Sequence, residues 1–244
     1  MEFENLRHLP WRVRNLLARY LEKICSLHSE NVVSLFAYGA IVEENFDFRE
    51  SEINLCVVLG KLSFSHLRDS LPIIREGLRK GIPAPLFLTR EHIKSSQDVF
   101  PLEFLQMKDY HILLYGEDVL ESVQVKREHL RLEVEEQIKG KLIHIRQAYL
   151  EMGLEKKGII NLLKQSLTVL IPVFRGILKL KDFNSIPPKD RFGIIKTLSE
   201  NFNLDDKIFL AILNKQKELG KKSLYYLERY IEEIQKLAGI VDTL

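Results

Sequence analysis

The residues best placed to do chemistry in the first half of the chain are Glu52 and Asn54, which open the apolar run INLCVVL at 53–59. Alternate residues of a strand point to the same face, so these two side chains should share a face, about 7 Å apart along the backbone. The preceding apolar run, VVSLFAYG, closes on Gly39. We expect the turn at Gly39 to lie next to Glu52 and Asn54, and to form a polar site with them.

This arrangement resembles the nucleotidyltransferase superfamily of the DNA polymerase β type. In that family a strand ending in Gly-Ser is followed by a short helix, a loop and a strand that opens with Asp-x-Asp. The resemblance implies that Glu52 and Asn54 occupy the catalytic positions. It also implies that Gly39, Ala40 and Ser51 occupy nucleotide-binding positions, and that Mg²⁺ is the cofactor.

The sequence departs from the family pattern where the chemistry is done. Ala40 replaces the serine and removes its hydroxyl, and Asn54 keeps the shape of an aspartate without its charge. The predicted third strand, residues 84–89, contains no acid. Mg²⁺ requires charged oxygen ligands in tight octahedral geometry, so we expect a lost or altered metal site in which Glu52 is the one carboxylate that could still bind the ion.

These departures leave three functional hypotheses. The first is a divergent module that binds a nucleotide or a partner protein. The second is an active transferase that moves a nucleoside monophosphate from a triphosphate to an acceptor with Mg²⁺. The third is an interaction protein whose helical half forms a homodimer or binds a cognate partner. The second hypothesis needs a substitute acid from a loop or helix: Asp47, Glu91, Asp98 or Glu103.

The spacing of apolar residues predicts an α+β chain in two parts, a mixed α/β domain over 1–120 and an all-helical bundle of about five helices over 121–244. Pro72 should kink or break the second predicted helix, whose apolar face is Leu67, Leu71, Ile74 and Leu78. The predicted helices are 10–28, 63–80, 100–107, 125–152, 158–180, 188–201, 204–219 and 223–238. The predicted strands are 32–39, 53–59, 84–89 and 111–116.

The helical half resembles the bundle that follows the catalytic domain in kanamycin-type aminoglycoside nucleotidyltransferases, and the related HEPN domains. The resemblance to HEPN ribonucleases implies an arginine separated from a histidine by four to six residues. His129 and His144 lack that arginine, so this nuclease activity is not expected. Tyr225, Tyr226 and Tyr230 could contribute to an interface with a partner.

The composition is that of a soluble globular protein, and no apolar stretch approaches the roughly 20 residues of a membrane span. Residues 1–120 carry a net charge of −3 and the remainder +5, and the total of +2 does not indicate a nucleic-acid binder. Cys25 and Cys56 fall among apolar residues, so we expect buried thiols and a cytoplasmic location. His66, His92 and His111 lack metal-ligand spacing and are expected at the surface or partly buried.

Overall fold

The computed structural model forms two compact units, residues 1–97 with 103–124 and residues 98–102 with 125–244. The sequence predicts a boundary between 120 and 121, close to the third crossing of the chain between these units, after residue 124. The described residues are 5, 9–42, 53–153, 155–215 and 217–244.

The first unit contains the mixed four-stranded sheet that the sequence predicts, in the order β3-β2-β1-β4. β1 pairs antiparallel with both β2 and β4, while β2 pairs parallel with β3. β2 is an inner strand, as its nearly continuous apolar sequence predicts. The strands are β1 (Val32–Tyr38), β2 (Asn54–Leu59), β3 (Leu86–Thr89) and β4 (His111–Gly116).

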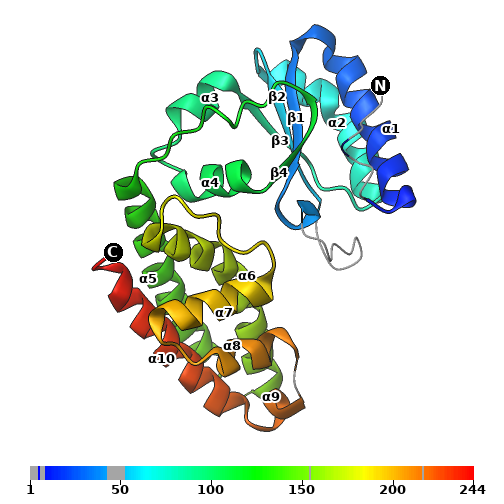
Figure 1. The fold of residues 1–244 in the computed structure, drawn as a ribbon. Coiled ribbons are helices and arrows are strands. Elements are labelled where there is room, and N and C mark those ends of the chain that lie inside the picture. Colours follow the sequence, from blue (N-terminus) through cyan, green and yellow to red (C-terminus); the bar gives the residue numbers. More distant parts are fainter. Residues whose placement is uncertain (1–4, 6–8, 43–52, 154, 216) are drawn as a thin grey trace. The chain divides into compact units, whose positions relative to one another are not determined.

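Two helices, α1 (Trp11–His28) and α2 (Phe64–Arg79), cover one face of this sheet (Figure 1). Alternation along the strands explains which residues they bury, because every second side chain points toward them. Side chains from the sheet and both helices form the core of the unit, among them Leu17, Tyr20, Ile24, Leu35, Ala37, Leu55, Val57 and Ile74.

The prediction for α2 holds only in part. Of the kink or break predicted at Pro72, the break does not occur, because the helix continues to Arg79. The face turned toward the core is also rotated from the predicted one, because small residues allow α2 to approach α1 closely. The residues that α2 buries are Ser70, Ile74 and Gly77, whereas Leu67, Leu71 and Leu78 are exposed.

Two short helices complete this region, α3 (Arg90–Ser95) and α4 (Pro101–Asp109). α4 confirms the helix predicted over 100–107. α3 occupies a polar segment for which the sequence predicts no element. Its first turn is capped by the side chain of Thr89, which accepts a hydrogen bond from the backbone N–H of His92.

The second unit is a helical bundle arranged around α6, which contacts each of the helices α5, α7, α8, α9 and α10. The single helix predicted over 204–219 is wrong: α8 ends at Leu213, and Lys215 adopts a positive φ of 51° before α9 begins. The helices are α5 (Arg127–Met152), α6 (Lys156–Lys181), α7 (Arg191–Phe202), α8 (Asp206–Leu213), α9 (Lys217–Lys221) and α10 (Ser223–Val241).

α6 is also, within the described part of the chain, the one helix long and apolar enough to cross a membrane by length and composition. It buries most of its second half inside the bundle, from Leu170 to Leu180. Its apolar character is therefore explained by its position as the core helix of this unit, as its scarcity of charge predicts.

Aromatic rings fill the centre of the bundle. Phe209 makes edge contacts with Phe174 and Tyr230, each at 5.7 Å between ring centroids. The Tyr230 hydroxyl shares a buried hydrogen bond of 2.9 Å with Ser166. Tyr230 thus belongs to the core of its own unit, which removes it from the surface open to a partner, whereas Tyr225 remains half exposed.

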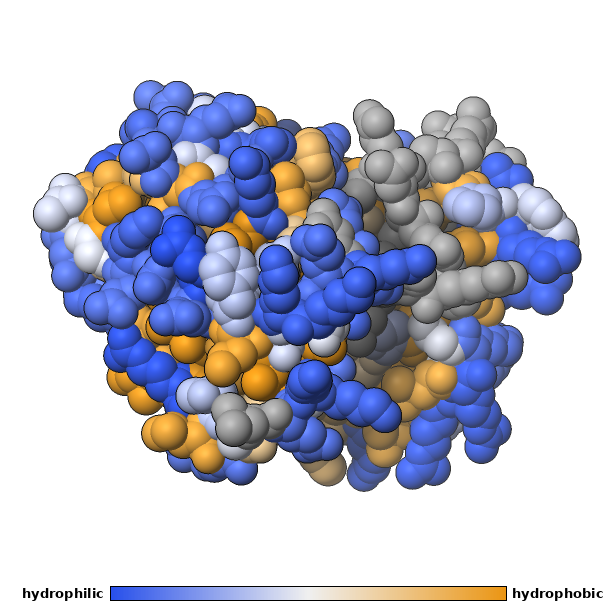
Figure 2. Space-filling view, turned by 90° about the horizontal axis from the view of Figure 1, so that it is seen from below, coloured by the Kyte–Doolittle hydropathy of each residue, from blue (hydrophilic) through white to orange (hydrophobic). Residues whose placement is uncertain are grey.

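Hydrophobic residues on the face displayed in Figure 2 lie among hydrophilic ones rather than in one uninterrupted area. Both cysteines are buried free thiols, as the sequence predicts. Burial raises the pKa of each thiol, most strongly for Cys56 within β2, so neither is primed to act as a nucleophile.

Candidate functional site

The turn at Gly39 lies directly beside the start of β2, as the sequence predicts. Tyr38, the last residue of β1, pairs with Asn54, the first residue of β2. Gly39 has a φ of +75°, and a Cβ at this position would lie 3.0 Å from Nδ2 of Asn54. The amide of Asn54 therefore faces a backbone bend that favours glycine.

Of the other predicted site residues, Ala40 lies in the 3₁₀ turn Gly39–Val42 that follows the bend, and is half-buried. Its methyl group offers no hydrogen bond. Ser51 and Glu52 lie outside the described residues, so their predicted roles stay predictions.

A row of polar side chains extends from Asn54 across the sheet. Tyr38 pairs with Asn54 on one side and with His111 on the other, so all three belong to one level of the sheet. The Phe36 ring, two residues earlier on the same face of β1, packs beside this row, at 6.1 Å from the Tyr38 ring and 5.9 Å from the His111 ring. Burial, with a smaller contribution from Cys56, raises the pKa of Tyr38 to about 12. Its phenol is therefore neutral at physiological pH and can both donate and accept a hydrogen bond.

His111 forms a pair with Asp118 that the sequence analysis missed. Its Nε2 is 2.9 Å from Oδ2 of Asp118, and its Nδ1 is 3.2 Å from the carbonyl oxygen of Lys108. The other carboxylate oxygen of Asp118 accepts a hydrogen bond from the backbone N–H of Leu120 at 3.0 Å. Both ring nitrogens of His111 thus face acceptors, which fixes the orientation of the imidazole.

One sequence signal could have suggested this pair. Gly116 ends β4 with a φ of +79°, and a Cβ there would lie 2.1 Å from the carbonyl oxygen of Val33. A glycine in that conformation turns the chain sharply, and this allows Asp118 to reach the side chain seven residues earlier. The expectation that His111 would be partly buried is confirmed.

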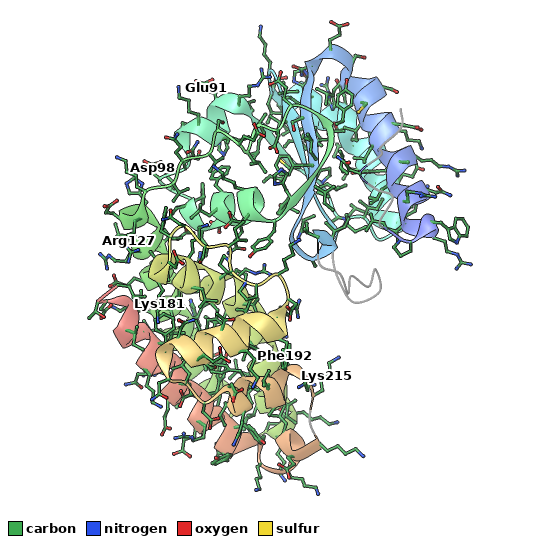
Figure 3. The ribbon with its side chains drawn as sticks, viewed as in Figure 1. Glu91, Asp98, Arg127, Lys181, Phe192 and Lys215 are labelled. Carbon is green, nitrogen blue, oxygen red and sulfur yellow. The ribbon has the colours of Figure 1, made fainter. Side chains whose placement is uncertain are left out.

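The third strand supplies no acid to this site. Leu86 of β3 pairs with Cys56 and Leu88 with Val58. Glu91 on α3 and Glu103 on α4 are both exposed, and Figure 3 shows Glu91 at the outside of its helix. Asp98 belongs to the second unit, and Asp47 lies outside the described residues.

The side-chain groups near this site that could coordinate a metal, among the residues that the structure describes, do not fit a pair of divalent cations. They comprise the amide of Asn54, the phenol of Tyr38 and the imidazole of His111, together with one carboxylate that already has two partners. Within the described ranges, no three His, Cys, Asp or Glu side chains gather so that they could hold a metal ion. We therefore derive no chemical step that passes through Mg²⁺.

The mixed sheet, the glycine bend beside the opening of its inner strand and the helical bundle that follows define a two-part nucleotidyltransferase fold. Among solved structures, the chain is similar to that of spectinomycin adenyltransferase AAD(9) from Enterococcus faecialis, a crystal structure with ATP and spectinomycin. The similarity covers 88% of this chain and 98% of that one, with a TM-score of 0.54 and 14% sequence identity.

At that identity the similarity concerns the fold and not the activity. No protein-family model matches the chain, and no curated protein sequence matches it. The α+β architecture is thus shown, whereas a nucleotide, a metal or a reaction must be argued from the chain's own residues.

Proposed function

We propose that this protein is a nucleotide-binding module with a nucleotidyltransferase fold, in which the two-metal transfer chemistry has been lost or altered. The observation that supports this most directly is the amide of Asn54 facing the Gly39 bend, with Nδ2 at 3.0 Å from where a Cβ of Gly39 would stand. A carboxylate in that place would repel a phosphate unless a cation lay between them, whereas an amide N–H donates a hydrogen bond to it.

The bend itself suits a phosphate. A glycine with positive φ has no side chain to keep a ligand away from the backbone, and adjacent N–H groups in such turns attract anions. The phenol of Tyr38 could add a further donor at the same level of the sheet. Nucleotide binding at this site would then rest on hydrogen bonds rather than on a metal bridge.

The first test is isothermal titration of the protein with ATP, GTP, CTP and UTP, in Mg²⁺ or in EDTA. We expect at least one triphosphate to bind with dissociation constants that agree within about threefold in the two buffers. Gly39→Ala should weaken binding at least tenfold, because the new methyl group is strained and contacts Asn54. Gly153→Ala is the matched control: Gly153 also has a positive φ, but a Cβ there would contact nothing within 4 Å.

A variant that introduces a negative charge sharpens this test. Asn54→Asp should weaken triphosphate binding in EDTA about tenfold, and Mg²⁺ should restore it, because the new carboxylate repels phosphate until a cation intervenes. If wild-type protein transfers a nucleotide in a Mg²⁺-dependent manner, and Glu52→Ala abolishes the transfer, the non-catalytic proposal is refuted. A complete lack of triphosphate binding would refute the binding role.

The hydrogen-bonded pair of His111 and Asp118 favours one alternative, an active transferase with an altered site. A histidine held by a carboxylate is a common general base. His111 could act as one if its Nδ1 exchanged the Lys108 carbonyl for a substrate, and β1 lies between His111 and Asn54. In that case incubation with labelled triphosphates and a cell extract should label an acceptor, and His111→Gln should abolish the labelling while triphosphate binding persists.

An interaction role for the helical half has its own support in Leu224 and Tyr225, neighbouring side chains of α10 that are 45% and 51% exposed. Light scattering coupled to gel filtration would detect a homodimer, and Tyr225→Ser should weaken it.

We also propose a cytoplasmic location, consistent with two unpaired cysteines.

A further inference from the structure

A cavity lies in the first unit between α1 and α2, away from the row of Asn54, Tyr38 and His111. These helices cover the face of the sheet that carries Leu35 and Val57, and side chains of alternate strand residues point the other way. The cavity has a volume of ≈ 590 Å³, within the range of pockets that hold small organic molecules.

The floor of the cavity is apolar. Leu16 and Tyr20 from α1, Ile73 from α2 and Ile82 from the segment that follows contribute to its lining. Ile82 and Tyr20 are almost completely buried, so this surface is fixed by the core beneath it. It favours a ligand with a flat or branched apolar body.

The rim of the cavity is charged, with an excess of cations. Glu76 accepts hydrogen bonds from Lys23 at 2.5 Å and from Lys80 at 2.7 Å. These two lysines lower the pKa of Glu76 to about 2, so it stays ionised at physiological pH. Arg19 and Glu22 also line the cavity, which gives three cationic and two anionic side chains. One carboxylate bound by two lysines leaves surplus positive charge, which favours an anionic group on the ligand.

The hydroxyl of Tyr20 supplies an independent indication. Tyr20 is 5% exposed, and its hydroxyl oxygen is fully buried without a hydrogen-bond partner among the described residues. Buried hydroxyl groups normally have a partner, so one without a partner requires an explanation, such as strain or a bound water, ion or ligand. The ring is held over Gly77, where a Cβ would lie only 2.6 Å from its Cε2 atom. The absence of a side chain at Gly77 is therefore what lets this tyrosine contribute to the cavity.

We propose that this cavity binds a small amphiphilic anion, with an apolar body on the floor of Leu16, Ile73 and Ile82 and an anionic head near Arg19. A polar atom of the body, admitted by a small adjustment of the lining, would give the Tyr20 hydroxyl its missing partner. The proposal does not rest on nucleotide binding, because it concerns the opposite face of the sheet.

Two probes of nearly identical shape test it by isothermal titration, 1-naphthaleneacetate and the neutral 1-naphthaleneacetamide. We expect the anion to bind at least fivefold more tightly. Arg19→Ala should bring the two affinities within about twofold of each other. Arg12→Ala, on the same helix but outside the cavity lining, should preserve the preference.

A third variant, Ile73→Trp, fills the cavity and should abolish binding of both probes, with folding checked by circular dichroism. If Ile73→Trp does not fold, the comparison of Arg19→Ala with Arg12→Ala still tests the proposal. Both arginines are exposed, so neither substitution should disturb folding. The proposal is overturned if neither probe binds at millimolar concentration, if the two arginine variants behave alike, or if a folded Ile73→Trp protein binds as wild type does.

Discussion

The contact between Tyr20 and Gly77 leads to a prediction that runs against ordinary helix propensity. Gly77 lies near the end of α2, where replacing glycine by alanine normally stabilises a helix by about 1 kcal/mol. Here the added methyl group would meet three atoms of the Tyr20 ring, at 2.6, 3.3 and 3.3 Å. Favourable carbon–carbon separations are about 3.5–4.0 Å, so the ring or the helix must move by close to 1 Å.

The size of the effect follows from two opposing contributions. Overpacking of a buried site costs about 1–3 kcal/mol, and Tyr20 has little room to move because it is 95% buried. After subtraction of the gain in helix propensity, Gly77→Ala should lower the free energy of unfolding by about 1 kcal/mol. Gly140→Ala in α5, where a Cβ would contact nothing within 4 Å, should raise it by roughly 0.5–1 kcal/mol.

Urea denaturation followed by circular dichroism measures both changes, and the background variant Tyr20→Leu identifies their cause. Without the outer ring atoms, alanine at position 77 should become neutral or stabilising. Two results would refute the reasoning. One is a Gly77→Ala protein as stable as Gly140→Ala; the other is an undiminished loss of stability in the Tyr20→Leu background.

Two further predictions concern buried polar groups. Burial, followed by the charge of His66, lowers the pKa of His28, so the folded protein binds this proton more weakly than the unfolded chain does. The contribution of neutral His28 to the free energy of unfolding is therefore fully present above about pH 6.5 and is lost as the pH falls through the lowered pKa. In urea titrations at several pH values, His28→Gln should reduce the loss of stability at acidic pH. His144→Gln on the surface should leave that loss unchanged. Tyr230→Phe should cost about 1–2 kcal/mol in the same assay by leaving the buried hydroxyl of Ser166 without a partner, and Ser166→Ala in addition should recover part of that loss.

Most of the fold could be predicted because its elements carry regular apolar patterns. The four predicted strands and the predicted helices other than 204–219 appear within a few residues of their predicted bounds. The errors fall where local pattern competes with packing. The leucines of α2 have helical spacing, yet the buried face is the one with Ser70 and Gly77, because close packing against Tyr20 requires small residues there. Hydrophobicity alone contains no signal for that choice.

The candidate site was predictable only in part, for a related reason. The proximity of Gly39 and Asn54 follows from strand pairing, which the sequence suggests through two neighbouring apolar runs. The pairing of His111 with Asp118 depends on a turn after β4, and the cavity depends on how two helices approach one another. Both are products of tertiary geometry, and neither has a fixed spacing in the sequence.

The alternation of side chains along β1 separates the two proposed sites. Leu35 and Ala37 contribute to the core beneath α1 and α2, while Phe36 and Tyr38 lie on the other face. A ligand at the polar row would contact the ends of strands, and a ligand in the cavity would contact two helices. The residues between the two sites are buried and close-packed. A small displacement of side chains at one site should therefore not be transmitted to the other. The two binding events should therefore be energetically independent unless α1 or α2 moves as a whole.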